Sequence, residues 1–193
     1  MKEEKIILTD CDGVLLAWEG AFHDWMIGKG FTKKAEATYD ISTTFGIPKT
    51  LGKKLVKEFN ESAWMGFLPA YKDARSGVAK LVEHGWKFIC ITSLSLDQKA
   101  QMLRISNLKN IFGKNVFIDV VCLDTGADKD EELAKFKDTE MWFIEDKPEN
   151  AEAGLKYGLK PILIEHEHNK DHVVDGIETA YDWEEIYNII EGV

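Results

Sequence analysis

The chain has 193 residues, 45% of them hydrophobic and 30% charged, and its formal net charge at pH 7 is -10. This length is enough for one well-buried core and too short for two ordinary domains. The acidic balance and the lack of a Lys/Arg block argue against a nucleic-acid polymer as partner, because proteins that bind polyanions need a basic surface. No apolar run approaches the roughly 18 residues that a membrane span needs, so we expect no membrane partner.

The strands and helices of the chain are predicted to alternate. Short apolar, β-branched segments predict strands over Lys5–Thr9, Trp86–Thr92, Val116–Leu123, Met141–Glu145 and Lys160–Glu165. Apolar residues at helical spacing predict helices over residues 73–85, 96–108, 128–136, 148–158 and 182–190. Strands that alternate with helices of this length predict an α/β fold, a doubly wound (Rossmann-like) parallel sheet of about five strands.

The segment between the first two predicted strands is too long for a simple crossover, which needs on the order of 20 to 30 residues. Its excess, residues 17–71, is rich in aromatic residues and shows helical spacing over residues 19–30 and 48–64. We therefore predict a small helical cap subdomain at 17–71, inserted after strand 1 and lying over the carboxyl edge of the sheet. Residues 1–16 and 72–193 would form the core domain.

The three cysteines, Cys11, Cys90 and Cys122, are widely spaced and form no CxxC motif. This pattern is typical of reduced thiols in a cytosolic protein. The sequence also opens without a charged-then-apolar leader. We therefore expect a cytoplasmic protein.

Polar residues follow the predicted strands at the edge where ligands bind in open α/β sheets. Clustered acids repel one another unless a cation lies among them, and oxygen-only ligands suit Mg²⁺. Hydroxyls, an ammonium group and Mg²⁺ together are what a transferring phosphoryl group requires. In strand order these residues are Asp10, Asp12 and Gly13; Thr92 and Ser93; Lys129 in the loop after the third strand; and Glu145, Asp146 and Lys147.

Four motifs stand in a fixed order across nearly the whole chain: DCDGV, ICITS, the lysine at position 129, and WFIEDKPEN. This ordered set resembles the haloacid dehalogenase superfamily of phosphohydrolases, whose first motif is DxDGx. The resemblance implies a phosphoric monoester hydrolase that acts on a small phosphorylated substrate with Mg²⁺ as cofactor. The acid at position 12 favours ester hydrolysis, since dehalogenating members lack it.

The resemblance assigns a role to each acid. Asp10 would attack phosphorus and form an aspartyl-phosphate, which splits one hard hydrolysis into two easier steps. Asp12 would protonate the leaving oxygen and then activate the water that releases phosphate. Mg²⁺ would bind the carboxylate of Asp10, the backbone carbonyl of Asp12 and the carboxylate of Asp146, with Glu145 among or just behind these ligands.

The resemblance also implies that Thr92, together with the backbone N–H of Ser93, holds a phosphoryl oxygen, and that Lys129 neutralises developing charge. Plainer structural interpretations stay open. Thr92 and Ser93 could form an ordinary strand-to-helix turn, and Lys129 could lie on a solvated helix start, in which case Lys99 would replace it.

The acids have plainer interpretations as well. Asp10 and Asp12 could cap the next helix, and Glu145 with Asp146 could cap the helix that begins near Pro148. The ordered motifs favour the functional interpretation in both cases.

The substrate is indicated by the junction between the predicted cap and the core. The segment SAWMGFLPAYKDARSGVAKL is similar to the corresponding region of the 5'(3')-deoxyribonucleotidases, which favours a nucleoside monophosphate. That group usually has an Asp-Asp pair where Glu145-Asp146 stands here. Another small phosphomonoester (a sugar phosphate or a phospho-amino acid), a phosphotransferase such as a mutase, and a non-catalytic binding module are the alternatives.

The hydrophilic segment EHEHNKDH contains His166, His168 and His172. Histidine is a good zinc ligand, but the segment has no matching cysteines. We therefore expect a solvated loop and not a second metal site.

Overall fold

The centre of the molecule is a six-stranded, all-parallel sheet. The computed structural model describes residues 4–35 and 40–193. The strand order is β3-β2-β1-β4-β5-β6, which confirms the predicted doubly wound α/β class. The strands are β1 (Lys5–Thr9), β2 (Trp86–Ser93), β3 (Phe117–Leu123), β4 (Trp142–Glu145), β5 (Lys160–Ile164) and β6 (Glu178–Ala180).

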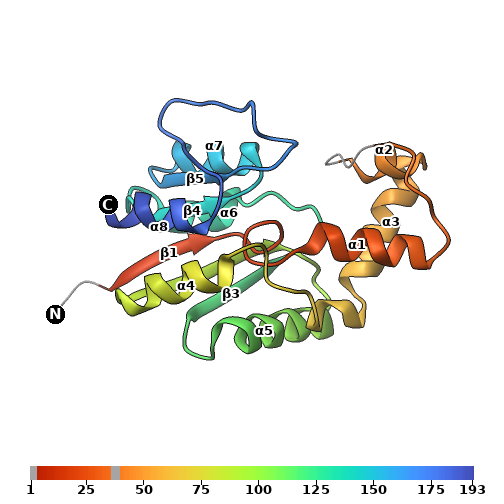
Figure 1. Ribbon diagram of the computed structural model, residues 1–193, viewed down its shortest axis with the longest axis horizontal. Coiled ribbons are helices and arrows are strands. Elements are labelled where there is room, and N and C mark those ends of the chain that lie inside the picture. Colours follow the sequence, from red (N-terminus) through yellow and green to blue (C-terminus); the bar gives the residue numbers. More distant parts are fainter. Residues whose placement is uncertain (1–3, 36–39) are drawn as a thin grey trace.

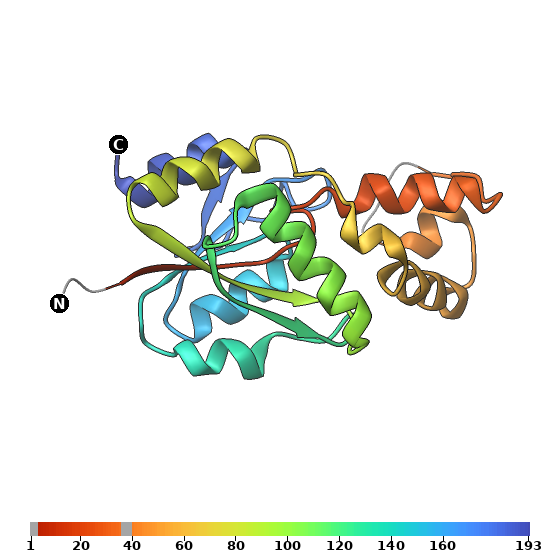
Figure 2. The same cartoon turned by 90° about the horizontal axis from the view of Figure 1, so that it is seen from below.

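Helices cover both faces of this sheet (Figure 1, Figure 2). Helices α4, α5 and α8 pack on one face, and α6 and α7 pack on the other. Their bounds are α4 (Ala74–Glu83), α5 (Gln98–Phe112), α6 (Asp130–Leu133) followed by the 3₁₀ turn η2 (Ala134–Phe136), α7 (Pro148–Lys156) and α8 (Trp183–Glu191).

The two covered faces explain why the strands are continuous apolar runs and do not alternate with polar residues. Ile7 of β1 belongs to the apolar cluster under α4, α5 and α8, together with Phe88 and Trp183. Its neighbour Leu8 belongs to the cluster on the opposite face, beside Phe143.

The insert after β1 forms a group of helices beyond one end of the sheet (Figure 1). It contains α1 (Trp18–Gly28), α2 (Ile41–Phe45), α3 (Lys49–Asn60) and the 3₁₀ turn η1 (Ala63–Gly66). Its aromatic rings pack on one another: Trp18 stacks on Phe22 with 4.7 Å between the ring centroids, and Phe59 meets Phe22 edge-on with 5.3 Å between the centroids. Residues 36–39 of the predicted cap lie outside the described residues, and the division at 17–71 stays a prediction.

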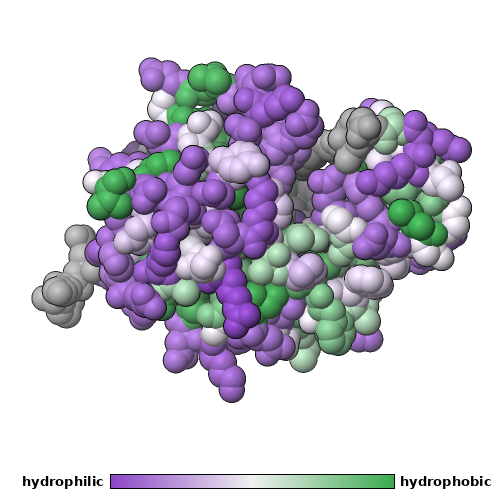
Figure 3. Space-filling model, in the orientation of Figure 1, coloured by the Kyte–Doolittle hydropathy of each residue, from purple (hydrophilic) through white to green (hydrophobic). Residues whose placement is uncertain are grey.

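The surface seen in Figure 3 is mostly hydrophilic. Apolar side chains gather where the insert meets the core. Among the exposed large apolar residues, Phe67 directly follows η1 and Met102 lies on α5. None of the described helices combines the length and the apolar character that crossing a bilayer requires.

Candidate active site

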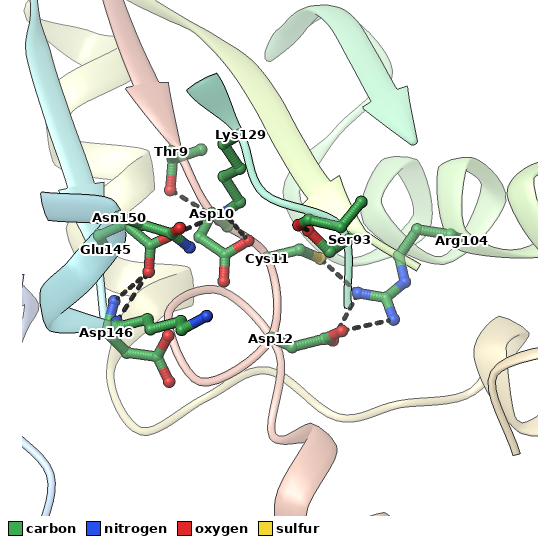
Figure 4. A network of polar contacts seen from close by, with 12 residues as sticks. Thr9, Asp10, Cys11, Asp12, Ser93, Arg104, Lys129, Glu145, Asp146 and Asn150 are labelled. Atoms are coloured by element: carbon green, nitrogen blue, oxygen red, sulfur yellow. Dashed lines mark hydrogen bonds and ion pairs between the residues drawn. The ribbon is translucent and has the colours of Figure 1, made fainter. Parts of the chain in front are cut away.

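Asp10 lies directly after β1, which pairs with β2 on one side and with β4 on the other. Its backbone N–H donates to the carbonyl of Ile144 in β4 at 2.8 Å, and its side chain is buried at the carboxyl edge. The Lys129 Nζ donates to Asp10 Oδ1 at 2.5 Å and to Glu145 Oε1 at 2.6 Å (Figure 4). One ammonium group therefore joins the ends of β1 and β4.

Lys129 is buried, and it precedes α6 instead of standing on a solvated helix start. Burial by itself lowers the pKa of a lysine. Here the charges of Asp10 and Glu145 outweigh burial and raise the pKa of Lys129, so it stays protonated. The other candidate lysine, Lys99, is exposed at the start of α5.

Glu145 has both carboxylate oxygens occupied. Oε1 accepts from Lys129 and from Asn150 Nδ2 at 2.7 Å, and Oε2 accepts from the backbone N–H groups of Asp146 and Lys147, each at 2.8 Å. Burial raises the pKa of Glu145, but the charge of Lys129 and these hydrogen bonds bring it below its usual value. Glu145 is thus an ionised anchor for the turn into α7.

Asp146 completes a cluster of three acids: one carboxylate oxygen each of Asp10, Glu145 and Asp146 lies within 4.8 Å of the others. Burial, with help from Glu145, raises the pKa of Asp146 well above its usual value. Burial also raises the pKa of Asp10 to about 7, although Lys129 opposes it. A lone buried ammonium group does not offset this charge, so a hard divalent cation suits the cluster. Because both carboxylate oxygens of Glu145 already accept hydrogen bonds, the carboxylates available to bind such a cation are those of Asp10 and Asp146.

Gly13 allows Asp146 to approach. Its φ is +78°, and a Cβ built at this position would overlap the Asp146 Oδ2. A side chain at position 13 would therefore strain the backbone and displace the carboxylate. The glycine of the DCDGV motif makes room for the acid of the WFIEDKPEN motif.

Asp12 points away from this cluster. Its carboxylate accepts from Arg104 Nη1 at 2.5 Å and from Nη2 at 3.1 Å. Arg104 extends from α5 and its side chain is fully buried, whereas that of Asp12 is 24% exposed. Figure 4 shows Asp12 directed toward Arg104 and Asp10 directed toward Lys129. Arg104 was not among the site residues predicted from the sequence, although it is one of the chain's two arginines, Arg75 and Arg104.

Thr92 and Ser93 end β2, where they pair with the end of β3. Thr92 is buried. The Ser93 hydroxyl donates to the carbonyl of Ala127 at 2.7 Å, and so holds the loop that carries Lys129. Both residues therefore lie at the edge predicted for the phosphoryl group, and their role in holding it stays a prediction.

His166 was expected in a solvated loop, but its side chain is only 11% exposed and lies against the turn at Gly13. Its Nε2 lies 2.9 Å from the carbonyl oxygen of Gly13 and 3.9 Å from Asp146 Oδ2, and its Nδ1 lies 3.3 Å from the Tyr71 hydroxyl. Burial lowers the pKa of His166. The expected absence of a triple-histidine metal site stays a prediction.

No family model matches this chain. An uncharacterized 32.4 kDa protein from the Gp30-rIII intergenic region of Enterobacteria phage T4 is 26% identical over 191 residues, which cover 94% of this chain and 68% of that protein. A haloacid dehalogenase-like hydrolase, SP0104 from Streptococcus pneumoniae, superimposes with a TM-score of 0.68 at 12% identity, covering 98% of this chain and 100% of the other.

Two further structures have the same architecture. D,D-heptose 1,7-bisphosphate phosphatase from B. bronchiseptica, in complex with magnesium and phosphate, gives a TM-score of 0.59 at 12% identity over 97% of this chain and 98% of its own. A putative beta-phosphoglucomutase from Thermotoga maritima gives 0.62 at 17% identity over 98% and 99%. The fold is that of the haloacid dehalogenase hydrolases.

Within the haloacid dehalogenase fold, the four sequence motifs occupy neighbouring positions at one sheet edge. They follow β1, end β2, precede α6 and end β4. The strand order brings β1 between β2 and β4, so residues more than 130 positions apart in the sequence meet around Asp10.

Proposed function

We propose that this chain is a Mg²⁺-dependent phosphomonoester hydrolase that acts through an aspartyl-phosphate. The observation that carries the proposal is the setting of Asp10. Its carboxylate is buried at the end of β1, held through Oδ1 by a protonated Lys129 and adjacent to Asp146. The heptose bisphosphate phosphatase of similar fold, in complex with magnesium and phosphate, supports the same chemistry.

In the first step, Asp10 forms a bond from its carboxylate oxygen to phosphorus while the bond from phosphorus to the leaving oxygen breaks. Lys129 fixes Oδ1, which leaves Oδ2 to attack. Asp12 gives its proton to the leaving oxygen, so the leaving group departs as an alcohol and the phosphoryl group stays on Asp10. Lys129 also offsets negative charge that accumulates beside Asp10.

In the second step, Asp12 takes a proton from a water molecule, and the water oxygen forms a bond to phosphorus. The bond between phosphorus and the Asp10 oxygen breaks, which releases inorganic phosphate and restores the Asp10 carboxylate. Mg²⁺ held by Asp10 and Asp146, with the predicted backbone carbonyl of Asp12, would supply charge stabilisation to the phosphoryl oxygens. Burial of the acid cluster excludes bulk water and so strengthens each of these interactions.

We propose a nucleoside monophosphate as the substrate. The support is the similarity of residues 62–81 to the 5'(3')-deoxyribonucleotidases, and the position of Tyr71 in that segment. The Tyr71 ring lies 5.0 Å from that of His166, beside the catalytic turn. An aromatic surface at this place suits a ligand with a flat ring. A sugar phosphate, a phospho-amino acid and phosphoryl transfer by a mutase are the competing possibilities.

The experiment is a phosphate-release screen over nucleotides, sugar phosphates, phospho-amino acids and p-nitrophenyl phosphate, with Mg²⁺ and with EDTA. We expect Mg²⁺-dependent release, greatest with nucleoside monophosphates. Asp10→Asn should abolish turnover and leave the chain folded, because the amide cannot attack phosphorus. Asp175→Asn, at an exposed loop position, is the matched control and should keep full activity. Unchanged turnover in Asp10→Asn would rule out the mechanism.

A further inference from the structure

Arg104 is a fully buried cation whose charge is met by one carboxylate. Among the described residues, Asp12 is the acid within ion-pairing distance of it. Its other hydrogen-bond acceptors are sulfur atoms: Cys11 Sγ lies 2.7 Å from Nη1 and Met65 Sδ lies 3.2 Å from Nη2, while Nε has no partner in the part of the chain that the structure describes. Sulfur is a weak acceptor. The ion pair with Asp12 is therefore what makes burial of this guanidinium tolerable.

The pair fixes the direction of the Asp12 carboxylate. A guanidinium is a planar fork that engages both oxygens of a carboxylate, which a lysine cannot do. The fork is itself immobilised, because α5 carries it and because η1 of the insert contributes Met65 to its surroundings. Asp12 is partly exposed, so without Arg104 its side chain could rotate toward solvent.

We propose that Arg104 is the positioning residue for Asp12: it fixes the orientation of the carboxylate that exchanges a proton with the leaving oxygen and with water. This role rests on the proposed function, in which Asp12 is the proton donor and acceptor. Each carboxylate oxygen has a second lone-pair site, so the proton can be transferred while Arg104 keeps its hydrogen bonds to Asp12. The buried arginine thereby connects α5 and the insert to the proton-transfer step.

A substrate series separates positioning from a purely structural role. An alkyl phosphate needs a proton on its leaving oxygen, whereas p-nitrophenolate departs as a stable anion. The value of kcat/KM reports the step in which the leaving group departs. A nucleoside monophosphate is an alkyl phosphate, and we expect Arg104→Met to lower its kcat/KM by roughly 10- to 100-fold. The same variant should lower kcat/KM for p-nitrophenyl phosphate by less than about 3-fold, and KM should change little for either substrate.

A double-mutant cycle supplies the second readout. In an Asp12→Asn background the proton-transfer group is already gone, so adding Arg104→Met should cause no further loss of kcat/KM. Arg75→Met removes the chain's other arginine, which is exposed on α4, and should match the wild type. Arg104→Lys keeps a buried cation without the fork; it should show the same selective loss and serves in place of Arg104→Met where that variant unfolds.

Several results would overturn the inference. Equal losses for both substrates, or a further loss in the Asp12→Asn background, would mean that Arg104 serves the fold alone. A faster reaction in Arg104→Met would mean that Arg104 holds Asp12 out of reach. A wild-type chain that releases no phosphate from either substrate with Mg²⁺ would overturn the proposed function, and the positioning role with it. An active wild type with an unaffected Arg104→Met would overturn the positioning role alone.

Discussion

Asp10→Asn should stabilise the metal-free chain at alkaline pH, even though it removes the proposed nucleophile. Burial raises the pKa of Asp10 from 3.8 to about 7. Because the folded-state pKa is above the unfolded one, the proton on Asp10 stabilises the fold below pH 3.8. That contribution is lost as the pH rises through about 7. A difference of about 3 pKa units corresponds to about 4 kcal/mol at 1.36 kcal/mol per unit.

The amide of asparagine is neutral at every pH, so the variant avoids this cost. At pH 8 and without metal, Asp10→Asn should be more stable than the wild type by up to about 4 kcal/mol, which corresponds to roughly 8 to 16 °C in Tm for a chain of this size. At pH 4 the two proteins should unfold together. Mg²⁺ should narrow the difference at pH 8, because a ligand that binds the folded wild type stabilises it by mass action.

The assay is thermal and urea unfolding at pH 4, 6 and 8, each with EDTA and with Mg²⁺, with Asp175→Asn as the exposed control. A gain in Tm that is the same at pH 4 and pH 8 would show that charge is not its source. An Asp10→Asn variant that is less stable than the wild type at pH 8 in EDTA would refute the charge crowding argued for this site.

Two further variants test the site's architecture. Lys129→Met leaves Asp10 without its buried cation and should cost about 3 to 5 kcal/mol of unfolding free energy in urea at pH 8. Lys135→Met removes an exposed ammonium group and should cost no more than about 0.5 kcal/mol. Gly13→Ala should weaken Mg²⁺ binding in calorimetry by roughly 10- to 100-fold, because it displaces Asp146. Gly30→Ala is the control, because Gly30 has a similar φ of +89° but no atom lies within 4 Å of the new Cβ. Retained Mg²⁺ binding in Gly13→Ala would contradict the claim that the glycine makes room for Asp146.

Four strands of the sheet, β1, β2, β4 and β5, could be predicted because burial on both faces makes each of them a nearly continuous apolar run, which is visible in the sequence. The edge strand β3 is half-exposed, and its β-branched residues made it recognisable. The sixth, β6, is a three-residue strand with only its last residue buried, so no apolar run marks it. The acids and Lys129 could be found because the strand-end rule and the ordered motifs assign them to one edge.

Arg104 and His166 could not be found in the same way. A buried arginine looks like any charged residue of an amphipathic helix until the partner carboxylate is located, and Asp12 is 92 positions away in the sequence. His166 lies in a segment whose composition is that of a solvated loop. Asn169 accepts a hydrogen bond from the His166 backbone N–H at 2.7 Å and donates to the Asp146 carbonyl at 2.7 Å. These tertiary contacts fold the loop back onto the site.

Two buried cations divide the acids at this edge of the sheet. Lys129 pairs with Asp10 and Arg104 pairs with Asp12, whereas Asp146 has no lysine or arginine within ion-pairing distance in the described part of the chain. The least compensated charge therefore lies at Asp146, next to Asp10, and a divalent cation gains most free energy where negative charge is least compensated. Arg104 turns the Asp12 carboxylate away from that place (Figure 4). The proposed proton-transfer group therefore points away from the proposed metal ligands, although Asp12 is two residues from Asp10 in the sequence.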